Sequence, residues 1–412
     1  MAKENIDKII PDLLRRGNLP KAEILLRAWL RESPEHPEAL FSLGQIAAAV
    51  NLPAEAANLF ERAARRAPQW PPPRVSLERL RPLLAGRASP DAETERFLLI
   101  KAWGYGFWAD VAHVLGQCLL AELTGRIPVV HWGTNSLFGD GGGSDAFRHY
   151  FEPLSRGRLA DLERAARDFW PPKWNHENLR AEDVNKWSGP YSGMAGLYLL
   201  GRPETVVVSD FFTPVIDLVP WIPPSHPRFG LGIDDLWRAL VARYLCPRPE
   251  IIAETDAFVR ERIGDAPFVA AHVRGSDKAL EVSDLAQTNR QYGSVIDAYL
   301  GRHSDSRLFL MTDDAHVLEQ FHGVYGDRLV ATDCQRTSSE RGIHYQEVPD
   351  RRRLGIEVMV DAYVAARAAA FIGNGASNPS LIVRYLKDWP DGAVHLFGGN
   401  MYHASNLYLH DW

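Results

Sequence analysis

From about residue 96 onward, short apolar runs alternate with longer amphipathic segments. The apolar runs predict strands, and the amphipathic segments between them predict helices. The expected strands are residues 97–102, 127–131, 205–209 and 268–273, and the runs that begin at residues 307, 329 and 370. Strands that alternate with helices form parallel, Rossmann-like sheets, and their functional loops gather at one edge.

One of these runs, Phe268 to Val273, ends in a charged tip. His272 stands near its end, and Arg274, Asp277 and Lys278 follow. Open parallel sheets bind ligands beyond the carboxyl ends of their strands, so this tip is expected at a ligand site. Two cations there favour an anionic ligand, because arginine matches phosphate oxygens and lysine adds a point charge. A salt-bridged surface cluster is the alternative.

The first 85 or so residues have an entirely helical pattern with an internal repeat at an offset of 34. The matching pairs are Ala22 with Ala56, Leu25 with Leu59, Leu26 with Phe60, and Pro34 with Pro68. This period resembles the tetratricopeptide repeat, well over residues 37–70 and partly over residues 3–36. A plain helical hairpin is the alternative. Since about three repeats are usually needed for independent stability, we expect this part to pack against the next domain.

Prolines and glycines then interrupt the helical pattern. The segments Trp70 to Arg74 and Gly86 to Pro90 predict linkers, because proline lacks an amide donor and its ring clashes with the preceding turn. The expected division is a tetratricopeptide-like helical domain at 1–88, a first lobe at 95–249 and a second lobe at 250–412.

A glycine loop, Gly104 to Gly106, separates the first expected strand from a helix at 109–123. A helix N-terminus after such a loop can aim backbone N–H groups at an anionic ligand. Gly104 and Gly106 are therefore candidate ligand-binding residues, and close packing of the loop on the sheet is the alternative.

Composition limits the function classes. The chain is globular, with 46% hydrophobic and 24% charged residues, and its net charge of −6 argues against a dedicated nucleic-acid binder. Its three cysteines are far apart, which fits a reducing compartment. We find no signal-like apolar core and no run long enough to span a membrane, and therefore expect a cytoplasmic protein.

Three blocks in the second lobe form a recognisable set. They are His272-Val-Arg-Gly-Ser-Asp-Lys278, Leu310-Met-Thr-Asp-Asp314, and Val360-Asp-Ala-Tyr followed by Phe371-Ile-Gly-Asn-Gly-Ala-Ser377. In this order they resemble the GDP-fucose-dependent fucosyltransferases of the α1,6 and protein O-fucosyltransferase superfamily. The resemblance covers roughly residues 265–390, and residues 104–131 resemble the family's N-terminal glycine loop and helix. It implies a fold of the GT-B type, with two facing Rossmann-like lobes.

The same resemblance implies roles for particular residues. Arg274 would bind the donor diphosphate and stabilise the departing nucleotide. His272 and Asp361 would contact the guanosine, and Ser377 would bind phosphate. The implied donor-binding set is His272, Arg274, Lys278, Asp361, Ser377, Asn378, Gly104 and Gly106. Glu281 is the first candidate for the catalytic base and Asp277 the second. The sequence departs from the family at Gly275, where many α1,6 members have a second arginine, and Glu281 stands one position away from the family's candidate acid.

The reaction implied is inverting transfer of fucose from GDP-fucose to a hydroxyl of a glycan or protein acceptor, which residues 1–88 could recruit. No Asp-x-Asp occurs in the sequence. We therefore expect no metal, with protein cations in its place, and no other cofactor. Two alternatives stay open: a transferase that uses another GDP-sugar, and a non-catalytic tetratricopeptide adaptor with a degenerate transferase body.

Overall fold

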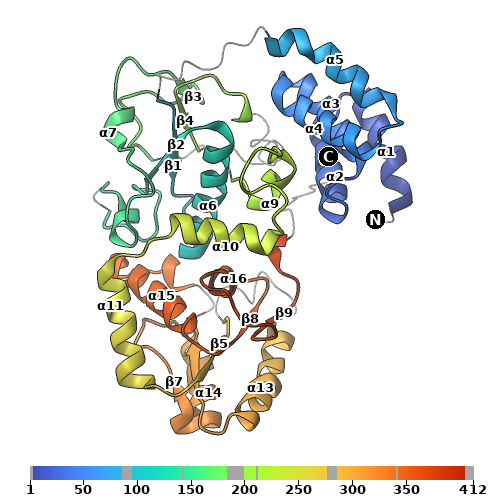
Figure 1. Cartoon of the computed structure of the whole chain (residues 1–412). Coiled ribbons are helices and arrows are strands. Elements are labelled where there is room, and N and C mark those ends of the chain that lie inside the picture. The colour runs from blue at the N-terminus through green and yellow to red at the C-terminus, as the bar shows by residue number, and fades with distance from the viewer. Residues whose placement is uncertain are drawn as a thin grey trace.

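The computed structural model shows a helical part beside two stacked α/β lobes (Figure 1). It describes residues 3–85, 95–141, 143–182, 199–209, 212–275, 285–339 and 342–403. The predictions for Asp277, Lys278 and Glu281 fall outside these residues. None of the described helices is both long and apolar enough to cross a membrane.

Consecutive helices of the N-terminal part pack against each other. They are α1 (Lys3–Arg15), α2 (Leu19–Glu32), α3 (Pro37–Ala49), α4 (Pro53–Arg66) and α5 (Pro71–Ala85). Gly44 of α3 permits a close approach to α4, because a Cβ atom at this position would lie 2.6 Å from the Phe60 ring. The all-helical prediction is confirmed, and the tetratricopeptide resemblance stays a prediction.

The linker predicted at residues 70–74 is wrong in one respect. Pro71 to Pro73 form the first turn of α5 and so begin a helix. The amide groups of a helix's first turn have no partner within the helix, so proline loses nothing there and its fixed φ angle favours the helix. The preceding helix α4 ends earlier, at Arg66, with Ala67 as its C-cap and Pro68 directly after it.

Within the described residues, the first lobe holds a four-stranded parallel sheet in the order β2-β1-β4-β3. Its strands are β1 (Phe97–Lys101), β2 (Ile127–His131), β3 (Phe169–Trp170) and β4 (Val206–Val208). Its helices are α6 (Phe107–Thr124), η1 (Ala146–His149), α7 (Leu159–Leu162), α9 (Val215–Leu218), η2 (Val219–Trp221) and α10 (Ile233–Tyr244). Strand β1 is buried along its whole length, as expected of a central strand in a parallel sheet.

The second lobe holds a parallel sheet in the order β7-β6-β5-β8-β9. Its strands are β5 (Phe268–His272), β6 (Arg307–Met311), β7 (Leu329–Val330), β8 (Ala370–Asn374) and β9 (Val394–Phe397). Its helical elements are α11 (Pro249–Phe258), the π-helical turn η3 (Val259–Ile263), α13 (Leu285–Arg302), α14 (Ala315–Tyr325), η4 (Gly326–Arg328), η5 (Ile343–Tyr345), α15 (Arg351–Ala365), α16 (Asn378–Tyr385) and η6 (Met401–His403). The expected α/β fold class, with two parallel sheets behind a helical region, is confirmed.

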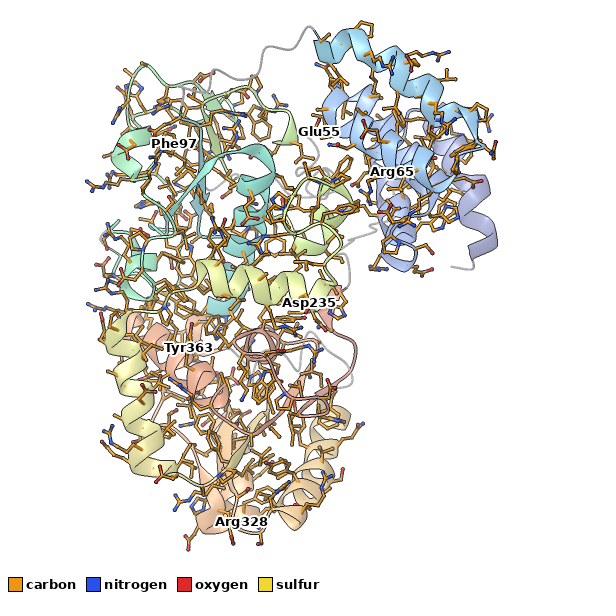
Figure 2. The ribbon with its side chains drawn as sticks, in the orientation of Figure 1. Glu55, Arg65, Phe97, Asp235, Arg328 and Tyr363 are labelled. Atoms are coloured by element: carbon orange, nitrogen blue, oxygen red, sulfur yellow. The ribbon has the colours of Figure 1, made fainter. Side chains whose placement is uncertain are left out.

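The carboxyl ends of the second lobe's strands face the first lobe. Arg328, just before β7, lies at the end of the second lobe that is farthest from the first (Figure 2). Since all strands of this sheet are parallel, their carboxyl ends point the other way. The loop after β7 accordingly reaches the first lobe, where Arg351 donates to the Leu137 carbonyl at 2.9 Å and His344 stacks near Phe138.

The helical part docks on the first lobe through buried arginines. The Arg27 Nη1 atom lies 2.6 Å from the Asp217 carboxylate of α9, and Arg27 Nε lies 2.7 Å from Glu23. Arg62 donates to the Pro220 carbonyl at 2.7 Å. These contacts agree with the expectation that the helical part packs against the next domain.

Candidate functional site

The carboxyl ends of β5, β6 and β8 bring the three sequence blocks to one edge of the second sheet. His272 pairs with Met311 across β5 and β6, and Ala271 pairs with Ile372 across β5 and β8. The residues that directly follow each strand are therefore neighbours, although they are about 40 to 100 positions apart in sequence. The candidate site is built on this edge.

Arg274 is fixed at the end of β5 by an acid from the next strand. Its Nη1 atom lies 3.1 Å from the Asp313 carboxylate, and the two side chains are 16% and 15% exposed. The backbone N–H of Gly275 points at the same carboxylate at 3.4 Å. Arg274 thus forms a largely buried ion pair, and Asp313 holds its guanidinium in one place.

Gly275 is required by the close approach of Asp314. A Cβ atom at this position would lie 2.3 Å from the Asp314 carboxylate, closer than real Cβ contacts allow. Asp314 is itself held in place, because it caps α14 by accepting the N–H groups of His316 and Val317. The sequence departure at Gly275 therefore follows from local packing in this chain.

His272 is buried beside Arg274 and carries no charge. Burial first, and the Arg274 charge second, lower its pKa to about 3. Its Nδ1 atom lies 2.6 Å from the Ser380 hydroxyl, which also accepts the Asn374 N–H. Which of the two groups donates in this contact depends on the tautomer of the His272 ring. His272 thus links β5 to α16, and its predicted contact with guanosine remains a prediction.

Asp361 of α15 is buried against the loop that follows β7. The Thr332 hydroxyl donates to its carboxylate at 2.6 Å, and the Cys334 thiol lies 3.8 Å away. Burial raises the Asp361 pKa to about 6, although Thr332 and Arg336 act in the opposite direction. The carboxylate faces inward, as the sequence block implied. A role in binding guanine stays a prediction.

Ser377 and Asn378 lie where β8 turns into α16. Ser377 occupies the N-cap position of α16, yet its side chain makes no capping hydrogen bond. It is 3% exposed. The side-chain amide oxygen (Oδ1) of Asn378 accepts the Tyr402 hydroxyl at 2.8 Å. The turn is held further by Gly375, whose N–H donates to the Phe397 carbonyl and whose own carbonyl accepts the Met401 N–H.

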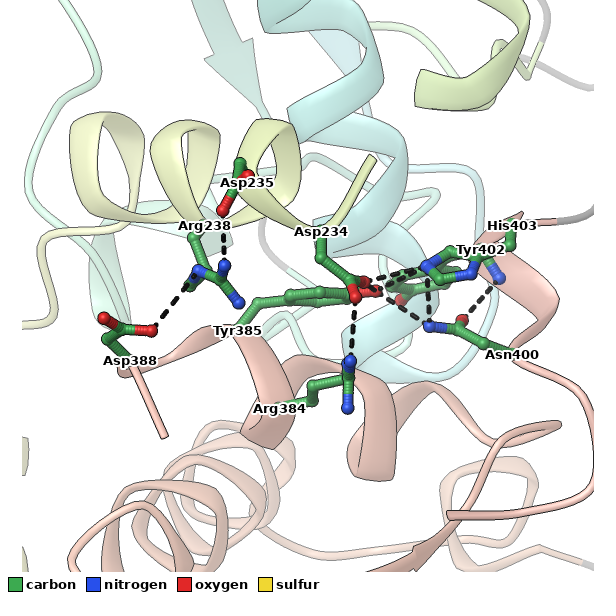
Figure 3. A network of polar contacts seen from close by, with 9 residues as sticks. All are labelled: Asp234, Asp235, Arg238, Arg384, Tyr385, Asp388, Asn400, Tyr402 and His403. Atoms are coloured by element: carbon green, nitrogen blue, oxygen red, sulfur yellow. Dashed lines mark hydrogen bonds and ion pairs between the residues drawn. The ribbon is translucent and has the colours of Figure 1, made fainter. Parts of the chain in front are cut away.

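A polar network joins this turn to the first lobe through α10 (Figure 3). The Asp234 carboxylate of α10 accepts the Tyr385 hydroxyl at 2.7 Å, pairs with Arg384 at 2.7 Å and lies 2.8 Å from His403. His403 first, and then Arg384 and Tyr385, hold the Asp234 pKa well below its usual range. Helix α10 also contacts α6, so the network fixes the second lobe to the first.

The glycine loop of the first lobe is stabilised from inside the protein. Asp110, in the first turn of α6, accepts the N–H groups of Trp103, Gly104 and Tyr105 at 3.1 to 3.4 Å. These amides are used in holding the loop. Gly104 has a φ of +88°, a backbone conformation that residues with a side chain rarely adopt. Gly106 is the N-cap of α6. A ligand-facing role for either glycine stays a prediction.

The glycine loop also meets the second lobe. A Cβ atom on Gly106 would lie 3.8 Å from the His344 imidazole. Tyr105, next to it, is 49% exposed, and Tyr345, next to His344, is 39% exposed. Each of these exposed tyrosines is one position away in sequence from a residue of this contact. These aromatic faces could support a sugar ring.

Sequence reasoning missed the residues that position the predicted ones. These are Asp313, Ser380 and Asp110. Asp313 was visible within the quoted Thr-Asp-Asp block, and Asp110 was visible as an acid in the first turn after a glycine loop. Within the part of the chain that the structure describes, no group of three or more metal-ligating side chains comes together.

No protein-family model and no curated protein sequence matches this chain. Among solved structures it is similar to NodZ α-1,6-fucosyltransferase soaked with GDP-fucose, at 20% identity and a TM-score of 0.46, covering 71% of this chain and 92% of that one. The fucosyltransferase NodZ from Bradyrhizobium gives 20% identity and a TM-score of 0.42, covering 70% and 93%. POFUT1 in complex with GDP-fucose gives 14% identity and a TM-score of 0.46, covering 76% and 100%. At such low values, the likeness does not by itself assign a function.

Proposed function

We propose that this protein is an inverting glycosyltransferase that moves fucose from GDP-fucose to a hydroxyl group of a glycan or protein acceptor. The observation that carries the proposal is Arg274, a cation held by Asp313 at the carboxyl end of the central strand β5. This edge of a parallel sheet is where such folds bind nucleotides. Ser377, at the N-terminus of α16, follows the neighbouring strand β8 and adds a hydroxyl that makes no capping bond.

The chemistry needs stabilisation of a leaving diphosphate. Negative charge develops on the β-phosphate as the bond to the sugar breaks, and a guanidinium held in advance lowers that barrier electrostatically. The positive end of α16 acts in the same direction. Because His272 beside Arg274 is neutral, it does not repel the guanidinium.

Protein cations replace a metal ion in this proposal. A nucleotide-sugar diphosphate needs its charge neutralised, and Arg274 supplies that charge without a carboxylate-bound ion. The proton of the acceptor hydroxyl must go to a base, for which Glu281 and Asp277 remain the candidates. Tyr105 and Tyr345 would support the acceptor between the lobes.

Calorimetric titration tests the donor site. We expect GDP and GDP-fucose to bind, UDP to bind much more weakly, and EDTA to change neither result. Arg274→Ala should lose GDP affinity, while Arg260→Ala, which removes an exposed arginine paired with Glu261, should not. Failure of all guanine nucleotides to bind at millimolar concentrations would overturn the proposal.

Turnover distinguishes an enzyme from an adaptor. We expect slow release of fucose from GDP-fucose by the wild-type protein, lost in Arg274→Ala. A protein that binds GDP-fucose but never releases the sugar, with or without acceptors, would be a binding module. Titration with GDP-mannose beside GDP-fucose decides which GDP-sugar is preferred.

A further inference from the structure

A cavity of about 450 Å³ lies beside the outer edge of β2 in the first lobe. Its wall is formed by β2 from Pro128 to His131, by residues 145–148 around η1, by residues 153–160, and by Arg180. None of the candidate donor residues lines it. Ligand-binding cavities are typically about 300 to 1,000 Å³, so this one is large enough for a monosaccharide.

The cavity wall carries an excess of positive charge. Four arginines line it, against the single carboxylate of Asp145; they are Arg148, Arg156, Arg158 and Arg180. Two of them are neutralised, Arg156 by Glu95 at 2.9 Å and Arg180 by Glu163 at 2.6 Å.

The other two arginines retain their charge. Within the described part of the chain, Arg148 and Arg158 form no ion pair. One oxygen of the Asp145 carboxylate accepts the N–H groups of Trp132 and Phe147, and the carboxylate attracts the Arg148 charge without forming an ion pair with it. Arginine forks are suited to oxyanions, so these two side chains form a potential clamp.

A buried histidine on the same wall lacks a partner. His131 ends β2, is 2% exposed, and its Nε2 atom has no hydrogen bond to any residue that the structure describes. Burial, and then the charges of Lys101 and Arg180, lower its pKa to about 4, so it is neutral at pH 7. An unsatisfied buried polar group is unfavourable, and a polar ligand in the cavity would relieve this.

We propose that this cavity binds a small anionic ligand of monosaccharide size, whose phosphate, sulfate or carboxylate group is held by Arg148 and Arg158. His131 forms the polar inner wall against the neutral part of the ligand. The site is separate from the proposed donor site and does not depend on the transferase proposal. The two arginines recognise the oxyanion of the ligand, and the cavity accepts the rest of a molecule of monosaccharide size.

Calorimetry on the full chain tests this site with four probes: glucose 6-phosphate, glucuronate, inorganic phosphate and neutral glucose. We expect the two anionic sugars to bind and glucose to bind at least about tenfold more weakly, because a charged hydrogen bond is lost. Whichever of glucose 6-phosphate and glucuronate binds more tightly shows whether the site prefers a phosphate or a carboxylate group. Phosphate alone should bind less tightly than glucose 6-phosphate.

Three variants assign the binding to the cavity. Arg148→Gln and Arg158→Gln should each weaken binding about tenfold or more. Both residues are exposed and unpaired, so the fold should be unaffected. Arg164→Gln is the matched control, because Arg164 lies on the same segment, pairs with Asp161 and does not line the cavity. This control should bind like the wild type.

Two outcomes would overturn the proposal. The first is the absence of anion binding at millimolar concentrations. The second is binding that Arg274→Ala abolishes while Arg148→Gln and Arg158→Gln leave it unchanged, because the anion would then occupy the donor site. Because GDP binding is titrated separately, failure here and failure of the proposed transferase function remain distinguishable.

Discussion

Arg274 and Asp313 follow neighbouring parallel strands, β5 and β6, and their side chains meet at 3.1 Å. Both side chains are largely buried, so the pair is less screened than an exposed ion pair would be. The acid determines where the guanidinium lies before any ligand arrives. We therefore regard Asp313 as a positioning residue.

The first prediction concerns Asp313→Asn, which keeps the side-chain size and removes the charge. GDP affinity should stay close to that of the wild type, because the Arg274 charge remains and a competing anion is gone. The rate of sugar transfer should fall by about 10- to 100-fold, because the guanidinium is no longer held in line with the leaving diphosphate. Calorimetry and steady-state kinetics measure the two effects.

Asp305→Asn is the control for this prediction. Asp305 is exposed at the opposite end of β6, where its carboxylate accepts the Ser304 hydroxyl. The Asp305→Asn variant should change neither the GDP affinity nor the rate of sugar transfer. Equal losses of affinity and rate in Asp313→Asn would instead indicate general damage to the site.

The second prediction compares two glycine substitutions. Gly275→Ala should lower the free energy of unfolding by about 1–3 kcal/mol, because the new methyl group collides with Asp314 and disturbs the cap of α14. Gly293→Ala in α13 meets no atom within 4 Å, and alanine favours a helix, so this variant should gain about 0.5–1 kcal/mol. Urea unfolding measures both. If Gly275→Ala leaves the free energy of unfolding unchanged, Asp314 is not held as described.

The third prediction uses two adjacent aspartates of α10. Asp234→Asn should cost about 2–3 kcal/mol of unfolding free energy, because its carboxylate serves Tyr385, Arg384 and His403. Asp235→Asn should cost less than about 0.5 kcal/mol, because Asp235 only pairs with Arg238 on the exposed helix surface. Figure 3 shows the two environments side by side.

The Asp234 effect should also depend on pH. Its pKa is lowered in the folded protein, so its stabilisation is complete above the ordinary aspartate pKa of about 4 and fades as pH falls below that value. The difference between wild type and Asp234→Asn should therefore shrink in acid. A difference that stays constant down to strongly acidic pH would show that charge is not the cause.

The fourth prediction concerns Glu23, which is buried and shares Arg27 with Asp217. Burial, with Asp217 adding to it, raises the Glu23 pKa to about 7 from an ordinary value of 4.5. A raised pKa means that the folded state binds the proton more tightly than the unfolded state. The contribution of Glu23 to stability should therefore be largest below pH 4.5 and be lost as pH rises to about 7.

Glu23→Gln tests this relationship. The variant should match the wild type near pH 4.5 and be more stable at pH 8, because no buried carboxylate has to ionise. Thermal unfolding across this range measures it. Glu32→Gln, on the exposed part of the same helix, should leave the wild-type pH dependence intact.

The sequence was most informative where structure is local. The apolar runs from Phe97, Ile127, Phe268, Arg307 and Ala370 all form strands, because a buried parallel strand must be apolar along its length. The strand β9 was not predicted, since Val394-His-Leu-Phe397 is short and carries a polar residue. The start of the α5 helix was hidden by Pro71 to Pro73, which predicted a break but lie in a first turn that needs no amide donors.

The candidate site could be predicted only in part, because its supports are non-local. The position of Arg274 at a strand end follows from its own run of residues. Its partner Asp313 comes from another strand, and only the strand order β6-β5-β8 brings the two together. The glycine loop illustrates the reverse. Its pattern suggested amides aimed at a ligand, and a role for Gly104 or Gly106 there stays a prediction. The structure adds that Asp110 accepts the amides of Trp103, Gly104 and Tyr105 from within the lobe.

The contact between Asp234 and His403 spans 169 positions of the chain. During synthesis, α10 emerges long before η6, so the Asp234 network cannot close until translation has passed residue 403. The first lobe and the helical part can acquire their own contacts earlier. Complete joining of the two lobes is therefore a late event in the synthesis of the chain. A pause in translation before residue 384 would leave the Asp234 carboxylate of α10 without Arg384, Tyr385 and His403.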